Sequence, residues 1–146
     1  MELLQALDTN DLDQALKVVL EHFKCQIGTI HVIESDGKLH LRAYTKGLPP
    51  DIVEASRVVP IGKGIAGLTA QNKKPMSMCN LHTDSDPRIP TKVKQSDMMG
   101  AICVPMFRGD DLIGTLGVAV MTERTFTREE ETLLTEAGRV IAKHVN

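Results

Sequence analysis

The sequence predicts a mixed α/β (α+β) fold built on a central antiparallel sheet of five to six strands. Two observations carry this prediction: amphipathic helical patterns lie at both ends of the chain, and two pairs of apolar segments are each joined by a short turn sequence, as in β-hairpins. Between the hairpins lie short helical segments and a long polar stretch. We therefore expect the terminal helices on one face of the sheet, and the short helices plus a lid loop on the other.

The composition predicts one soluble domain over residues 1–146. The 146 residues are 42% apolar, which suits a single core, and no stretch approaches the roughly 18 apolar residues of a membrane span. The formal charge of -2 comes without blocks of like charge, so we expect neither a nucleic-acid nor a membrane partner. Three widely spaced cysteines and the lack of a signal peptide favour a reducing, cytoplasmic location.

The first elements follow from periodicity and turn residues. Apolar residues three and four positions apart predict a helix from Asp11 to about Phe23, after a helical turn near Leu3 to Leu7. Alternating β-branched residues predict a core strand over Ile27–Ile33, returning over Leu39–Tyr44. Alternation places Thr29 and His31 on one face of the first strand and Ile30 and Val32 on the other.

The later elements are predicted in the same way, in chain order. They are a short helix over about 51–56, a helix over about 65–72, an edge strand over 75–79, a polar lid over 80–97 with one helical turn near 91–94, and two central strands over 99–107 and 112–121. Thr127 and Glu130 form a capping box that opens the last helix.

Residues 61–67, Ile-Gly-Lys-Gly-Ile-Ala-Gly, contain the spacing G-x-G-x-x-G. In a dinucleotide-binding unit such glycines follow a buried parallel strand and open a long helix. Here Pro60 interrupts the strand and Pro75 ends the helix after about two turns, while the candidate acids Asp84 and Asp86 lie in the polar loop. The prolines therefore favour a tight turn that starts a short helix beside a ligand pocket.

The order of several motifs resembles the GAF domain family. The resemblance covers about Asp11 to Val145 and rests on the glycine stretch, Pro75, Asp86-Pro87-Arg88, Val104-Pro105-Met106, Ile113-Gly114-Thr115-Leu116-Gly117 and Phe126-Thr127. It implies a GAF/PAS-like sheet that binds a small regulatory ligand on the face opposite the terminal helices, and pairing of two chains through those helices. Leu16 and Leu133 are predicted to support that pairing.

Three specialised branches of the family match less well. The cyclic-nucleotide signature Asn-Lys-x-Phe-Asp-Glu is broken after Asn72-Lys73, and the lid carries His82 without the adjacent cysteine of pigment-binding relatives. Free methionine-R-sulfoxide reductases resemble this chain around the glycines but place cysteines where it has Ser56 and Ala66, and another near Lys94. Thiolate chemistry needs those thiols, so we expect no enzymatic activity.

The predicted ligand-binding residues come from the first strand, the glycine-led helix, the lid and the third long strand. They are Thr29, His31, Ile65, Ala66, Asn80, Arg88, Met99 and Cys103. For His31 two interpretations stay open: an imidazole satisfied by a backbone group, or one that contacts the ligand. Cys79 and His82 are three positions apart, but no second pair supports a metal site.

The sequence thus predicts a non-enzymatic sensory domain that binds a small ligand and signals through its terminal helices. It identifies no cofactor and does not name the ligand. Two alternatives are kept: a dimerisation or interaction domain without a pocket, and the reductase. The chain can be a whole protein or part of a larger sensor.

Overall fold

The computed structural model describes residues 2–81 and 97–145. In chain order the elements are α1 (Glu2–Ala6), α2 (Leu12–Phe23), β1 (Ile27–Ile33), β2 (Leu39–Tyr44), α3 (Pro50–Ser56), β3 (Val58–Val59), α4 (Gly64–Asn72), β4 (Met76–Met78), β5 (Gly100–Arg108), β6 (Asp111–Val120) and α6 (Arg128–Ala142). The predicted helical turn near 91–94, and most of the predicted lid with His82 and Arg88, lie outside the described residues.

The six strands form one antiparallel sheet in the order β3-β2-β1-β6-β5-β4. This confirms the predicted antiparallel sheet of five to six strands. The two long C-terminal strands are both interior, but the middle pair of the sheet is β1 and β6, with β5 one position further out. β3 and β4 form the edges, and Pro75 directly precedes β4, where a missing amide donor is tolerated.

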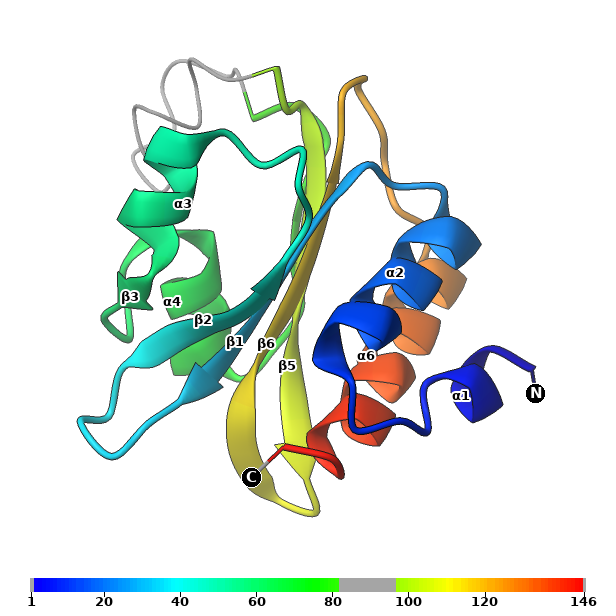
Figure 1. Ribbon diagram of the computed structural model, residues 1–146. Helices are drawn as coiled ribbons and strands as arrows, with labels where there is room; N and C mark the ends of the chain where they lie inside the picture. Colours follow the sequence, from blue (N-terminus) through cyan, green and yellow to red (C-terminus); the bar gives the residue numbers. More distant parts are fainter. Residues whose placement is uncertain (1, 82–96, 146) are drawn as a thin grey trace.

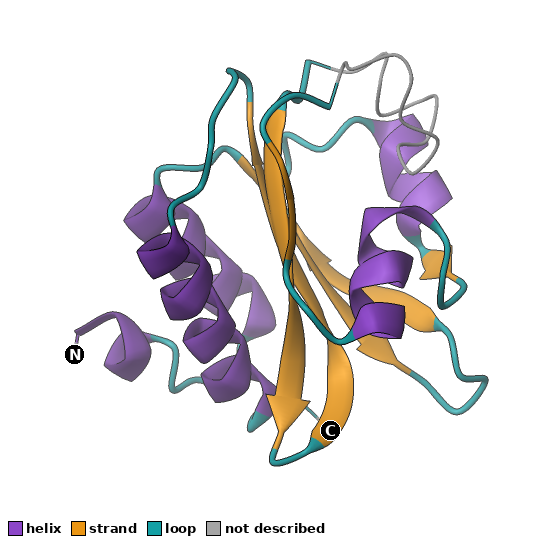
Figure 2. Ribbon diagram, turned by 180° about the vertical axis from the view of Figure 1, so that it is seen from behind, coloured by secondary structure: helices purple, strands orange, loops and turns teal. Residues whose placement is uncertain are grey.

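The helices cover both faces of the sheet as predicted (Figure 1). α2 and α6 lie side by side on one face, while α3 and α4 lie on the other, which the reverse view also shows (Figure 2). The main apolar core fills the space between the sheet and the terminal helices and includes Leu16, Ile30 and Leu134. A second, smaller cluster lies on the opposite face. No helix of the described residues is long and apolar enough to cross a membrane.

Both terminal helices begin at a side-chain cap, and the one at Thr127 is the capping box predicted from the sequence. The Asp11 side chain accepts the Gln14 amide at the start of α2. In α6 the Thr127 hydroxyl accepts the Glu130 amide while the Glu130 carboxylate accepts the Thr127 amide, so the capping box is complete. At the other end of α6, Arg108 on β5 donates to the carbonyl oxygen of Ala142, the last residue of the helix, and to that of Val145 just beyond it.

The alternation predicted for β1 decides which side chains reach each face. Ile30 and Val32 point into the main core, and His31 lies on the opposite face among the cavity residues. Gly28 is covered by α2, since a Cβ there would lie 2.8 Å from Cδ1 of Leu16. The strand is irregular between Ile30 and His31, where the pairing register with β2 shifts.

Candidate functional site

A cavity of about 400 Å³ lies between the sheet and the short helices α3 and α4. Its floor consists of residues from β1, β6 and β5, and its walls come from α3, from the turn after β3 and from the start of α4. Most of the lining is apolar; Ile27, Leu48, Ile52, Leu81, Met98 and Ala119 belong both to the lining and to the second core cluster. Such a cavity is of the size and character that small-molecule sites have.

The glycine stretch builds one wall of this cavity. Residues 60–63 form a tight turn in which the Lys63 amide donates to the Pro60 carbonyl at 3.1 Å, and Gly62 occupies it with a φ of +94°. Gly64 follows with a φ of +64°. Gly67 packs on the turn, because a Cβ there would lie 2.5 Å from the Pro60 oxygen. Each glycine therefore has a steric reason that involves no phosphate group.

This turn directs the first residues of α4 into the cavity wall. Gly64, Ile65 and Ala66 all line the cavity, and the amides at a helix start have no partners within the helix. Lys63 occupies the N-cap without a side-chain capping bond and is the one charged residue among the described lining residues. Apart from Lys63, this wall is apolar in its side chains, and its backbone is electropositive.

Three neighbouring strands supply the polar part of the floor. Thr29 on β1 and Cys103 on β5 both pair with Gly117 on β6. A Cβ at Gly117 would lie 3.3 Å from the Thr29 hydroxyl and 3.7 Å from the Cys103 sulfur. The missing side chain of Gly117 therefore leaves this hydroxyl and this thiol beside the open centre of the floor.

His31 is 3% exposed and links the floor to α3. Its Nε2 lies 2.8 Å from the carbonyl oxygen of Ser56. A carbonyl only accepts, so in the neutral ring Nε2 carries the hydrogen and Nδ1 is an acceptor. Burial lowers the pKa of His31, and this outweighs the opposite effect of the bond to Ser56. The ring is therefore neutral near pH 7.

Two buried polar atoms near this position have no hydrogen-bond partner in the described structure: Nδ1 of His31 and Oγ1 of Thr115. The two residues are direct cross-strand neighbours of β1 and β6. His31 and Thr115 therefore place two unpaired polar atoms in an otherwise apolar region.

Cys103 is fully buried beside the cavity. Burial raises the pKa of its thiol to about 11, and the Thr69 hydroxyl beside it only partly offsets that effect. Close to pH 7 almost none of it is thiolate, the form that acts as a nucleophile. Cys103 is thus suited to packing and to weak hydrogen bonding.

Five of the eight predicted site residues line the cavity: Thr29, His31, Ile65, Ala66 and Cys103. Asn80 and Met99 are not among the described lining residues; their sequence neighbours Leu81 and Met98 line the cavity instead. Met99 precedes β5, and its backbone bonds to Leu81 and Val120, so the alternation within β5 does not extend to it. Arg88 lies outside the described residues. Contact of these side chains with a ligand stays a prediction.

Several lining residues were not predicted from the sequence, above all Leu81, Met98 and Gly117. The sequence could have indicated Leu81, because a large apolar residue at the start of a polar segment is expected to be buried. Gly117 had none, because its role depends on which residues of β1 and β5 lie beside it.

The fold and the cavity together define a class of small α+β domains that enclose a ligand-sized space between an antiparallel sheet and short helices. A family model for the GAF domain matches residues 9–146, so the chain belongs to the GAF domain family. No curated protein sequence matches the chain.

Solved structures with this fold come from a phosphotransferase, from methionine sulfoxide reductases and from a sensor kinase. The GAF domain of an Acinetobacter phosphoenolpyruvate-protein phosphotransferase superposes with a TM-score of 0.80 at 17% identity, over 98% of this chain and 87% of that one. The free methionine-R-sulfoxide reductase of Neisseria meningitidis, solved with its substrate, gives 0.78 at 18% identity, over 98% and 83%. A domain of a putative two-component sensor histidine kinase from Sinorhizobium meliloti gives 0.70 at 14% identity, over 90% and 86%. At these identities the likeness establishes the fold alone.

Proposed function

We propose that this GAF domain is a non-enzymatic sensory module that binds one small molecule, with an apolar body and a few polar groups, in the cavity between the sheet and the helices α3 and α4. The observation that carries the proposal is the cavity of about 400 Å³, whose floor is left open at Gly117. This space also speaks against the alternative of an interaction domain without a pocket. The sensor histidine kinase among the structural neighbours supports a regulatory role.

The chemistry of the lining supports binding more than catalysis. The described lining contains no carboxylate, one exposed lysine, a neutral histidine bound to a backbone carbonyl, and a thiol whose pKa is about 11. A nucleophile or a general base needs a group activated near pH 7. Binding of an apolar body beside a few hydrogen-bonding groups needs only what is present.

The reductase is the alternative with a specific basis, since reductases of this kind share the fold. By resemblance their cysteines fall at Ser56 and Ala66, and both of these residues line the cavity here. The cavity is thus in the right place for that chemistry, but these two positions carry a hydroxyl and a methyl group. We therefore infer that the domain has no methionine sulfoxide reductase activity.

A thermal-shift screen tests the proposal directly. We expect one class among nucleotides, amino acids, 2-oxo acids and aromatic acids to raise the melting temperature of the wild-type chain, because a ligand at 100 times its Kd stabilises by about 2.7 kcal/mol. Free methionine-R-sulfoxide is included, together with an assay of its turnover. Turnover would contradict the non-enzymatic proposal.

Gly117 provides the matched control for this screen. Gly117→Ile should fill the centre of the cavity floor and so abolish the thermal shift. The variant should still fold, because its Cβ needs only a small movement of the Thr29 hydroxyl. Gly117→Ala adds the same Cβ without the remaining side chain and should retain most of the shift. A shift that survives in a folded Gly117→Ile variant would place the ligand elsewhere.

A further inference from the structure

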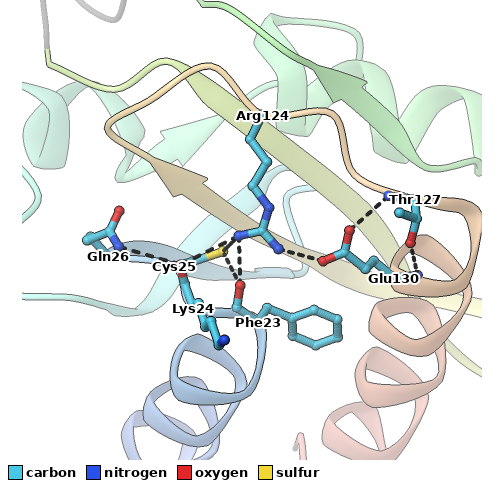
Figure 3. A network of polar contacts seen from close by, with 7 residues as sticks. All are labelled: Phe23, Lys24, Cys25, Gln26, Arg124, Thr127 and Glu130. Atoms are coloured by element: carbon cyan, nitrogen blue, oxygen red, sulfur yellow. Dashed lines mark hydrogen bonds and ion pairs between the residues drawn. The ribbon is translucent and has the colours of Figure 1, made fainter.

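Arg124 lies in the connection between β6 and α6, and its side chain contacts both terminal helices (Figure 3). Its Nη1 donates to the carbonyl of Phe23, the last residue of α2, at 2.7 Å. Its Nη2 forms an ion pair of 2.5 Å with Glu130 in the first turn of α6. The guanidinium also lies over the ring of Phe126, 4.4 Å from its centre. One side chain therefore joins the end of α2 to the start of α6.

Both contacts suit the charges of the groups involved. The last carbonyls of a helix have no partners within the helix and carry a partial negative charge, so a cation is favourable beside Phe23. The amide of Thr127 and the guanidinium of Arg124 lower the pKa of the Glu130 carboxyl group, so Glu130 is charged at neutral pH and stays charged in mildly acidic solution. Arg124 is three-quarters buried, so solvent screens these contacts less than it screens an exposed ion pair.

The backbone of the same residue is bonded to the segment that follows the edge strand β4. The Arg124 amide donates to the carbonyl of Cys79 at 3.1 Å. Two residues beyond Cys79, Leu81 donates its own amide to Met99 at 2.6 Å and contributes a side chain, 2% exposed, to the cavity lining. Gly100 packs on the same point, since a Cβ there would lie 3.1 Å from the Arg124 nitrogen.

We propose that Arg124 couples the cavity wall to the terminal helices. A change in the position of Leu81 moves Cys79, and through the bond to Cys79 it moves the backbone of Arg124. The guanidinium then has to shift relative to Phe23 and Glu130, which changes how firmly the end of α2 and the start of α6 are held. The inference builds on the proposed function, since it supplies the route from an occupied cavity to the helices.

The test replaces the ligand with a substitution in the cavity wall. Leu81→Val shortens the side chain, and amide hydrogen exchange is measured over the last turn of α2 and the first turn of α6. In the wild-type background we expect exchange in both turns to change about 2- to 30-fold, the range of measured coupling between linked sites. In an Arg124→Gln background, Leu81→Val should leave these turns unchanged. An equal response in both backgrounds, or no response in either, would overturn the coupling.

Two further variants make the result specific. Arg42→Gln breaks an exposed ion pair with Glu34, 3.0 Å long, on the β1–β2 hairpin, and should leave the response to Leu81→Val intact. Glu130→Gln keeps an acceptor for the capping box but removes the ionic partner of Arg124, so the response should become smaller. Glu130→Gln also replaces Arg124→Gln in the test if the latter does not fold. An exchange response to Leu81→Val in the Glu130→Gln background as large as in the wild type would contradict the proposal.

This experiment separates the two proposals because it uses no ligand. A screen without hits would count against ligand binding and would leave the exchange result unaffected. A response to Leu81→Val that does not depend on Arg124 would exclude the coupling and leave ligand binding untouched.

Discussion

His31 has the backbone partner expected of a structural histidine and also lies in the cavity lining, while its contact with a ligand stays a prediction. Its Nε2 bonds to the backbone of Ser56. The bond also sets the tautomer, so the remaining nitrogen is an acceptor. A neutral and fixed imidazole therefore forms part of the cavity lining.

The lowered pKa of His31 predicts a pH dependence of stability. Its ordinary value is 6.5, and burial, the largest influence, lowers it in the folded state. Below about pH 6.5 the unfolded chain therefore binds a proton that the folded chain resists, and the free energy of unfolding falls on acidification towards the folded pKa. This one group changes stability by at most about 1.4 kcal/mol per pH unit.

Urea unfolding at about pH 7.5 and pH 5.5 measures this effect. His31→Gln retains a donor for the Ser56 carbonyl but does not titrate, so its loss of stability between these pH values should be smaller than that of the wild type. The same loss in both chains would show that His31 titrates normally.

Among the elements, the bounds predicted from the sequence are most accurate where a regular strand is flanked by turn residues. The bounds of β1 and β2 were predicted as observed, because alternation and flanking turn residues coincide there. Met99 precedes the start of β5 at Gly100, and its neighbour Met98 is the residue that lines the cavity. Gly117 could not be predicted from the sequence as a cavity residue, because the pattern within each strand does not show which strands lie next to each other in the sheet.

The start of α4 supplies a prediction at this scale. In most helices Gly→Ala stabilises by about 0.5–1 kcal/mol, because alanine has the better helix propensity. Gly67→Ala should instead destabilise by about 1–3 kcal/mol, since its Cβ would lie 2.5 Å from the Pro60 oxygen and overpack the turn. Denaturant unfolding measures the sign. Gly47→Ala, whose Cβ meets only the end of the Ile27 side chain, is the control and should change stability less.

For the molecule as a whole, the structure changes which side chains can serve in pairing of two chains. Leu16 is 2% exposed and packs over Gly28 within one chain. Leu16→Glu should therefore unfold the domain rather than separate two folded copies, contrary to its use as a pairing residue. Leu133 is half-buried on α6, packed at the margin of the main core, and remains a suitable position.

We predict a homodimer through the terminal helices that Leu133→Glu weakens while the fold is retained. A charge at a helix–helix interface loses hydration without gaining a partner, so the dissociation constant should rise at least tenfold, about 1.4 kcal/mol. Sedimentation velocity over a range of concentrations measures it. Leu68→Glu on α4, which is half-buried on the other side of the sheet, should not alter association. Monomers at all concentrations would exclude the dimer.

The pairing of β1 with β6 also bears on how the domain forms. Residues 27–59 form one half of the sheet, the strands β1, β2 and β3. Residues 76–120 form the other half, the strands β4, β5 and β6. The cavity floor crosses the boundary between them at Thr29 and Gly117. During synthesis the N-terminal strands emerge first, but their partner strand arrives about 80 residues later, and such distant pairing slows folding. A ligand can therefore stabilise this domain only after β6 has joined the sheet, late in the folding reaction.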